Sequence, residues 1–215
     1  MIKDIFFDFD GVLVESVNVK TEAFRNLYLP YGNEIADKVV EHHQNNGGVS
    51  RFEKFKIYHK SFLNEEIDEL KVQELANQFS NLALDGVLEA PNVKGAKDFL
   101  ENYKDEFNYW IITGTPTTEI KIILDRKGWT PYFKGVYGSP TKKYEWTESI
   151  IEKENLRREE IVFIGDATAD YDAANKSGLS FVLRETKEGE NLFKEYNGPR
   201  IKDISELYNR IKELN

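Results

Sequence analysis

The chain has 215 residues, 40% of them hydrophobic and 31% charged, which is enough to bury a core as one domain or as one domain with a smaller insert. Its formal net charge of -9 argues against a broad affinity for nucleic acid or for anionic membranes. The sequence contains no cysteine, which excludes disulfides and thiolate catalysis and fits a cytoplasmic location, and we expect no signal peptide and no membrane span.

The first element expected is a buried strand that ends in acid. The apolar run from Ile2 to Phe9 suits a strand covered on both faces in a parallel sheet, and ligands bind beyond the carboxyl ends of such strands. Asp8 and Asp10 stand at that end, and Gly11 lets the backbone turn beside them. Two neighbouring carboxylates repel, and Mg2+ is a hard ion that would neutralise them. Acidic pairs are also common in solvated loops, so the other motifs of the chain are needed to choose between a metal site and a loop.

The segment from Glu15 to Leu88 changes to charged, helical patterns, which predicts an inserted helical unit. We therefore expect a core domain from residues 1–14 and 89–215 and a cap domain from residues 15–88. Apolar residues near helical spacing are expected to form the internal packing of the cap: Val49, Phe52, Phe55, Phe62, Ile67, Leu70, Leu75, Phe79 and Leu82.

A polar, glycine-rich turn interrupts the cap segment before one of its helices. Ser50 is expected to cap that helix, with Arg51 and Lys54 in its first turns. These two cations have two equally weighted interpretations, as exposed basic residues or as an anion-binding site. The three histidines show no partner pattern and are interpreted as surface or internally satisfied residues.

After the cap segment, short apolar runs alternate with amphipathic helical segments, which predicts a parallel α/β sheet. The further strands are expected at Asn108–Ile112, Phe133–Tyr137, Ile161–Ile164, Ser180–Leu183 and residues 199–201. Polar residues follow three of them in order: Thr113 with Gly114, Lys142 with Lys143, and Asp166 with Asp170. Because parallel strands end at one edge, one crevice could collect them all.

Four strand ends in this order, with these residues, resemble the haloacid dehalogenase superfamily of hydrolases. Its phosphatases carry an apolar strand with a DxDG motif, a Ser or Thr after the second strand, a lysine and a GDxxxD motif. The resemblance spans the whole chain and implies a Rossmann-like core with an inserted helical cap, as in phosphoglycolate phosphatases and β-phosphoglucomutases.

The resemblance also implies roles for the residues at these positions. Asp8 would be the nucleophile that forms an aspartyl-phosphate, and Asp10 the general acid and base. Thr113, the Gly114 amide and Lys142 would hold the phosphoryl oxygens, with Lys143 as the alternative lysine. Mg2+ would be held by Asp8, the backbone carbonyl of Asp10 and Asp166, with Asp170 behind them orienting water or pairing with the lysine.

The expected function is a Mg2+-dependent phosphatase acting on a small phosphate monoester, such as a phosphosugar or phosphoglycolate. Arg51 resembles a cap residue that contacts the far end of the substrate, but Lys20 replaces a histidine of the mutases, which leaves a phosphomutase as the alternative. Dehalogenation needs no metal, so the acidic cluster favours phosphate. A non-catalytic phosphate-binding or regulatory module is the alternative from another class. Lys20 has three open interpretations: contact with the substrate, a pair with Glu15 or Glu22, or exposure to water.

Overall fold

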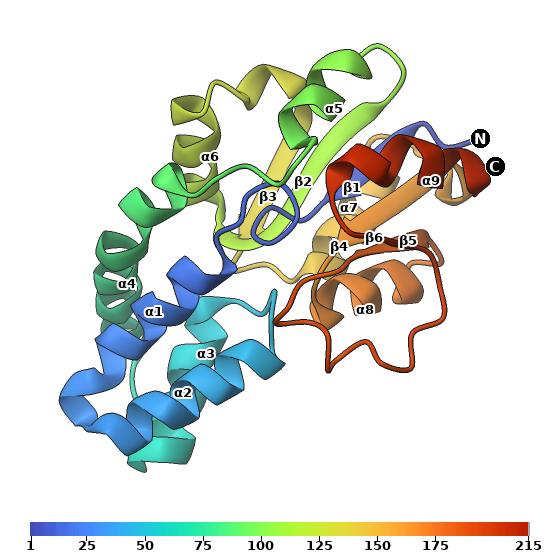
Figure 1. Cartoon of the computed structure of the whole chain (residues 1–215). Coiled ribbons are helices and arrows are strands. Elements are labelled where there is room, and N and C mark those ends of the chain that lie inside the picture. The colour runs from blue at the N-terminus through green and yellow to red at the C-terminus, as the bar shows by residue number, and fades with distance from the viewer. Residues whose placement is uncertain (215) are drawn as a thin grey trace.

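The computed structural model, which describes residues 1–214, contains one parallel sheet of six strands in the order β3-β2-β1-β4-β5-β6. The strands are β1 (Asp4–Phe7), β2 (Asn108–Pro116), β3 (Phe133–Ser139), β4 (Ile161–Gly165), β5 (Ser180–Arg184) and β6 (Arg200–Ile201). The N-terminal strand that leads to Asp8 and Asp10 therefore lies in the middle of the sheet, between β2 and β4, and all its residues are buried (Figure 1). The predicted α/β fold with a parallel sheet is confirmed.

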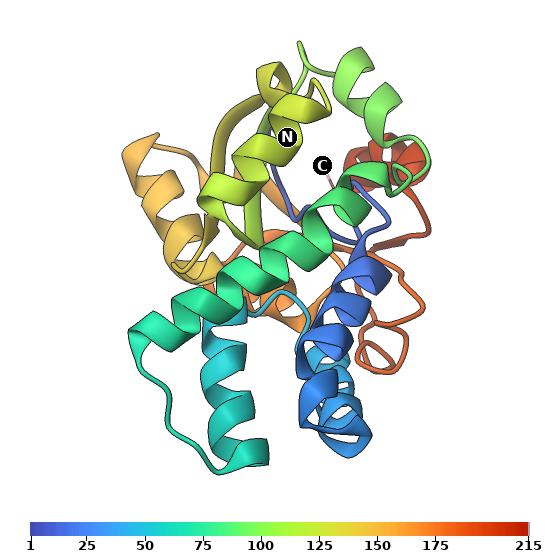
Figure 2. The same cartoon turned by 90° about the vertical axis from the view of Figure 1, so that its left-hand side faces the viewer.

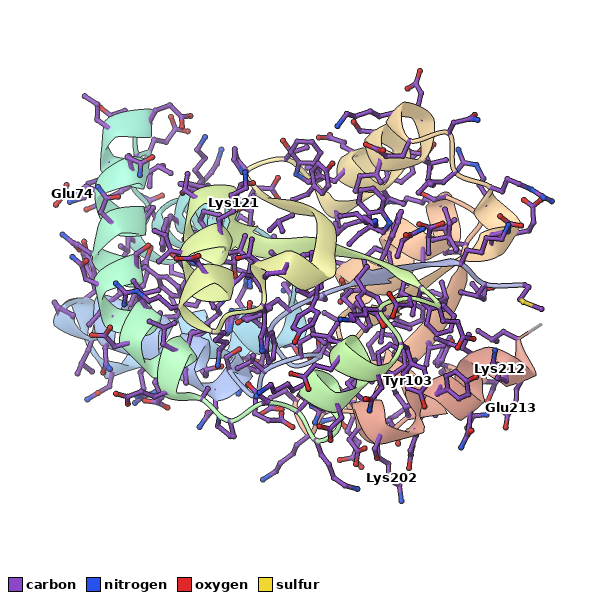
Figure 3. The ribbon with its side chains drawn as sticks, turned by 90° about the horizontal axis from the view of Figure 1, so that it is seen from above. Glu74, Tyr103, Lys121, Lys202, Lys212 and Glu213 are labelled. Atoms are coloured by element: carbon purple, nitrogen blue, oxygen red, sulfur yellow. The ribbon has the colours of Figure 1, made fainter. Side chains whose placement is uncertain are left out.

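Helices cover both faces of this sheet. One face packs against α5 (Ala96–Asn102), α6 (Thr117–Arg126) and α9 (Leu207–Glu213) in the larger apolar core. The other face packs against α7 (Lys143–Lys153) and α8 (Thr168–Lys176). Figure 3 shows α5 and α9 side by side at the end that carries Tyr103 and Lys212, where the rings of Tyr103 and Tyr208 stack at 4.3 Å.

Four helices inserted between β1 and β2 form the cap: α1 (Val17–Tyr28), α2 (Asn33–Asn45), α3 (Arg51–Tyr58) and α4 (Glu69–Glu89). Figure 2 shows them as a separate group below the sheet, with α4 leading back to the core. An aromatic cluster fills the cap, and Phe24 packs against both Phe55 and Phe79. Leu70 and Leu82 are exposed, so their predicted place in the cap interior is wrong; the packed face of α4 carries Val72, Leu75, Ala76, Phe79 and Ala83 instead.

The carboxyl ends of β1, β2, β3 and β4 face the cap, so the loops that follow these strands lie between the two parts of the chain (Figure 1). The second strand runs four residues further than predicted, through Pro116, because it keeps pairing with β3 after a register shift. No helix within residues 1–214 combines the length and the apolar character needed to cross a membrane.

Candidate active site

Three buried carboxylates meet at the carboxyl edge of the sheet. Asp8 follows β1, Asp166 follows β4, and Asp170 lies in the first turn of α8. One oxygen from each lies within 4.8 Å of the others, and none of the three residues is more than 8% exposed. Residues separated by more than 150 positions are thus brought together because β1 and β4 are neighbours in the sheet.

Lys143 supplies the positive charge at this cluster. Its Nζ lies 2.9 Å from Asp8 Oδ2 and 2.5 Å from Asp170 Oδ1, and these carboxylates outweigh the cost of burial and raise the pKa of Lys143. The prediction of Lys142 at this place is wrong: its side chain is 67% exposed and lies 3.6 Å from Glu53. The alternative lysine of the pair is the one that turns inward, because α7 begins at Lys143 and directs this side chain toward the sheet edge.

Asp166 and Asp170 differ in their hydrogen bonds. The Asp170 carboxylate accepts from Lys143 and, at 3.1 Å, from the Ala167 amide, whereas no described residue donates to the carboxylate of Asp166. Burial, Asp8 and Asp170 together raise the pKa of Asp166 well above its usual value. A buried carboxylate without a donor beside two others is costly unless a cation meets it.

The cluster fits a divalent cation. Three carboxylates face a single lysine, so their full ionisation would leave two negative charges uncompensated in a buried place. Oxygen ligands of this kind suit a hard ion. The Asp166 oxygens have no donor among the described residues and are free to hold it, whereas Asp8, which accepts from the Phe9 amide and contacts Lys143, would offer its remaining lone pairs. The bonds of Asp170 to Lys143 and Ala167 suit the predicted supporting position behind the ion.

Asp10 lies beside this cluster, in a different set of contacts. Its carboxylate accepts from Ser16 Oγ at 2.6 Å and from Thr115 Oγ1 at 2.9 Å, and it contacts the Lys20 ammonium. Burial opposes ionisation, but the Lys20 charge and the hydrogen bonds from Lys20, Ser16 and Thr115 outweigh it and lower the pKa of Asp10. The Asp10 carboxylate is thus held apart from the three-carboxylate cluster, and only its backbone carbonyl remains the predicted metal contact.

The turn at the end of β2 and the glycine loop of the cap pack directly on each other. Thr113 is 2% exposed and lines the same pocket as Asp8, and a Cβ atom added to Gly114 would lie 2.7 Å from the Gly48 carbonyl oxygen. A Cβ on Gly48 would similarly lie 3.3 Å from Lys143 Nζ. The cap therefore lies closed over the carboxylates, and small residues on both sides permit the close approach.

Gly11 has a positive φ of 79°, and a side chain there would collide with the Asp166 carboxylate. We expect Gly11→Ala to weaken Mg2+ binding and to destabilise the fold by about 2–4 kcal/mol, from backbone strain and displacement of Asp166. Gly128→Ala is the matched control, because Gly128 also has a positive φ, of 68°, but open space around it. Urea unfolding and Mg2+ titration check this; equal losses in both variants would contradict the collision.

Arg51 is held by the core domain. The guanidinium donates to Glu119 Oε1 at 2.7 Å and to Oε2 at 2.9 Å, and to Ser80 Oγ at 2.8 Å, and it is 4% exposed. Although burial opposes ionisation of Glu119, its bonds to Arg51 lower its pKa. Arg51 lines the pocket, but Glu119 already neutralises its charge. The ion pair therefore links the cap to the core, and the guanidinium is not available to the predicted substrate anion.

We expect Glu119→Gln to destabilise the protein by about 3 kcal/mol or more, because the substitution leaves a buried guanidinium without its counter-charge. Glu53→Gln, which removes an exposed partner of Lys142, is the control and should change the free energy of unfolding by less than about 1 kcal/mol. Thermal and urea unfolding give both values. Similar free energies of unfolding for the two variants would show that the ion pair between Arg51 and Glu119 does not stabilise the protein.

Three further residues of the pocket had no single role predicted from the sequence, and for Lys54 an anion-binding role was one of two open interpretations. Lys20 contacts Asp10 and Thr115, and His43 and Lys54 line the pocket from α2 and α3. One signal was available for the last of these. Arg51, Lys54, Phe55 and Tyr58 are spaced i, i+3, i+4 and i+7, which is the pattern of a buried helix face, and all four are buried.

A parallel sheet with helices on both faces, a helical cap after the first strand and converging acids at the sheet edge define a capped α/β protein with an acidic site. The family model of haloacid dehalogenase-like hydrolases matches residues 5–183. The chain belongs to this family of enzymes, and the resemblance of its motifs is confirmed.

Solved structures show the same fold over the whole chain. A β-phosphoglucomutase from Clostridium difficile is 21% identical and has a TM-score of 0.80, covering 100% of this chain and 97% of its own. A predicted phosphatase from Clostridium acetobutylicum is 19% identical with a TM-score of 0.77, covering 99% of both chains. A hydrolase of this family from Bacillus subtilis, solved with bound magnesium, is 19% identical with a TM-score of 0.70, covering 98% of this chain and 99% of its own. No curated protein matches the sequence.

Proposed function

We propose that the protein is a Mg2+-dependent phosphatase that hydrolyses a small phosphate monoester through an aspartyl-phosphate on Asp8. The observation that carries this proposal is the position of Asp8: its carboxylate lines the pocket between Lys143 and the carboxylates of Asp166 and Asp170. A bound Mg2+ would neutralise the acids and withdraw charge from the phosphoryl oxygens.

The chain's own residues can perform both halves of the reaction. The Asp8 carboxylate would attack phosphorus and the ester P–O bond would break. The leaving oxygen would take its proton from Asp10, which must first be protonated against the lowered pKa that Lys20, Ser16 and Thr115 give it. Water would then attack the phosphorus of the aspartyl-phosphate, with Asp10 taking the proton and Asp8 leaving as a carboxylate. Lys143, Thr113 and the Gly114 amide would hold the phosphoryl oxygens during both transfers.

The closed cap supports a small substrate. Gly48 touches the core turn at Gly114, and Arg51 is bound to Glu119, so the pocket is covered on the cap side. A cover of this kind excludes bulk water from the reacting groups. A folded phosphoprotein would not fit beneath it, which favours a phosphosugar or phosphoglycolate type of ester.

Product analysis tests this proposal against its alternatives. With Mg2+ and a panel of small esters that includes a sugar 1-phosphate, we expect free phosphate to be released. Conversion of the sugar 1-phosphate to its 6-phosphate isomer would indicate a phosphomutase. Tight binding of phosphate esters without turnover would indicate a binding module.

A further inference from the structure

Lys54 is a buried cation that the proposed reaction does not use. It lies on α3 of the cap, is 1% exposed, and lines the pocket opposite the carboxylates of the core. Its Nζ lies 2.9 Å from His43 Nδ1 and 5.5 Å from the centre of the Phe24 ring. Of the three ammonium donors, His43 can occupy one, so two remain for a ligand.

The other cations that line the pocket or lie directly beside it all have carboxylate partners. Arg51 is bound by Glu119, Lys20 by Asp10, and Lys143 by Asp8 and Asp170. Within residues 1–214 no carboxylate lies within ion-pair distance of Lys54, and it is the pocket-lining cation without one. Burial, with Lys20 and Lys143 nearby, lowers the pKa of Lys54 to about 7, which describes a charge that the protein leaves uncompensated.

A buried lysine without a counter-charge destabilises the fold, so its place in the pocket needs a reason other than stability. Neighbouring side chains do not provide that reason. Phe24 and Phe79 at this end of the pocket are apolar. Burial and the Lys54 charge lower the pKa of His43 well below its usual value, so His43 supplies no negative charge and no ion pair. A neutral His43 would accept from the ammonium and aim its remaining donors into the pocket. An anion brought in by the substrate is the partner that this arrangement lacks.

We propose that Lys54 binds a second anionic group of the substrate, a carboxylate or a second phosphate, at the end remote from the phosphoryl group that is hydrolysed. This inference rests on the proposed phosphatase function and narrows its substrate to monoesters with a second negative charge. Lys54 replaces Arg51 in the part that the sequence assigned to the arginine, because Arg51 is neutralised by Glu119.

Matched pairs of esters test the proposal: 2-phosphoglycolate against 2-hydroxyethyl phosphate for a carboxylate, and glucose 1,6-bisphosphate against glucose 1-phosphate for a second phosphate. The wild type should favour the anionic member of at least one pair by about 10-fold or more in kcat/KM, as a charged hydrogen bond provides. The pair that shows the preference identifies the anion.

Lys54→Met and Lys54→Gln should remove this preference, and the ratio within the pair should fall toward one. Lys56→Met is the control, because Lys56 lies on the same helix but is exposed and bound to Glu69 at 2.5 Å. A wild type without preference in either pair would overturn the proposal. So would an equal loss for both members of a pair in Lys54→Met, which indicates a merely structural lysine.

Binding separates this proposal from the phosphatase function. Calorimetry with Mg2+ compares Asp8→Asn with Asp8→Asn/Lys54→Met, using the same pairs of esters and no turnover. Tighter binding of the anionic member that depends on Lys54 supports the second anion site even if no ester is hydrolysed. Equal binding of both members overturns it even if the protein is an active phosphatase.

Discussion

Asp8→Asn is expected to abolish phosphate release, with a fall in kcat on the order of 10^4-fold or more, as for other groups that form covalent intermediates. The amide is nearly the same size as the carboxylate, so it fills the same place beside Lys143 and the Phe9 amide, which donates to Asp8 Oδ1 at 2.7 Å. It is, however, a poor nucleophile and carries no charge.

The measurement is phosphate release with saturating Mg2+, together with circular dichroism to show that Asp8→Asn is folded. Loss of the buried charge should relieve repulsion with Asp166 and Asp170, so we expect the apo variant to be at least as stable as the wild type. A folded Asp8→Asn variant with wild-type turnover would exclude Asp8 as the nucleophile.

Lys143→Met should produce the second large loss, and Lys142→Met should produce almost none. Lys143 contacts two of the three clustered carboxylates and is almost fully buried, while its neighbour is exposed. We expect kcat to fall by about 10^2-fold to 10^4-fold in Lys143→Met, since a donor to the transferring phosphoryl group is lost.

Stability provides a second readout for the same pair of variants. Removing Lys143 leaves Asp8, Asp166 and Asp170 without their counter-charge, so we expect destabilisation of about 3–5 kcal/mol without metal. Added Mg2+ should recover part of this loss, because the ion binds the folded state alone. An active Lys143→Met with an inactive Lys142→Met would restore the original assignment.

The sequence was most informative where local chemistry is unambiguous. An apolar run that ends in Asp8 and Asp10 can lie in few places, and the repeated strand and helix pattern leaves a parallel sheet as the natural solution. The convergence of Asp8 with Asp166 then follows from the rule that parallel strands end at one edge. Both the fold and these two positions could therefore be predicted.

The lysines could not be assigned in the same way. Whether Lys142 or Lys143 turns inward depends on the residue at which α7 begins, and a shift of one position moves a side chain by about 100° around a helix. Lys54 and Arg51 had two equally weighted interpretations, exposed residues or an anion-binding site, because charge on a helix is usually solvated. Their burial depends on Glu119 and Phe24, which long-range packing brings to them.

Mg2+-dependent phosphate release by the wild-type protein is the most direct test of the central claim. Acetyl phosphate, p-nitrophenyl phosphate and a panel of small monoesters would be assayed with Mg2+ and again after chelation. We expect phosphate to be released with Mg2+, to stop on chelation and to resume when the ion is restored. No phosphate release from any ester by a folded protein that binds Mg2+ would contradict the proposed phosphatase function.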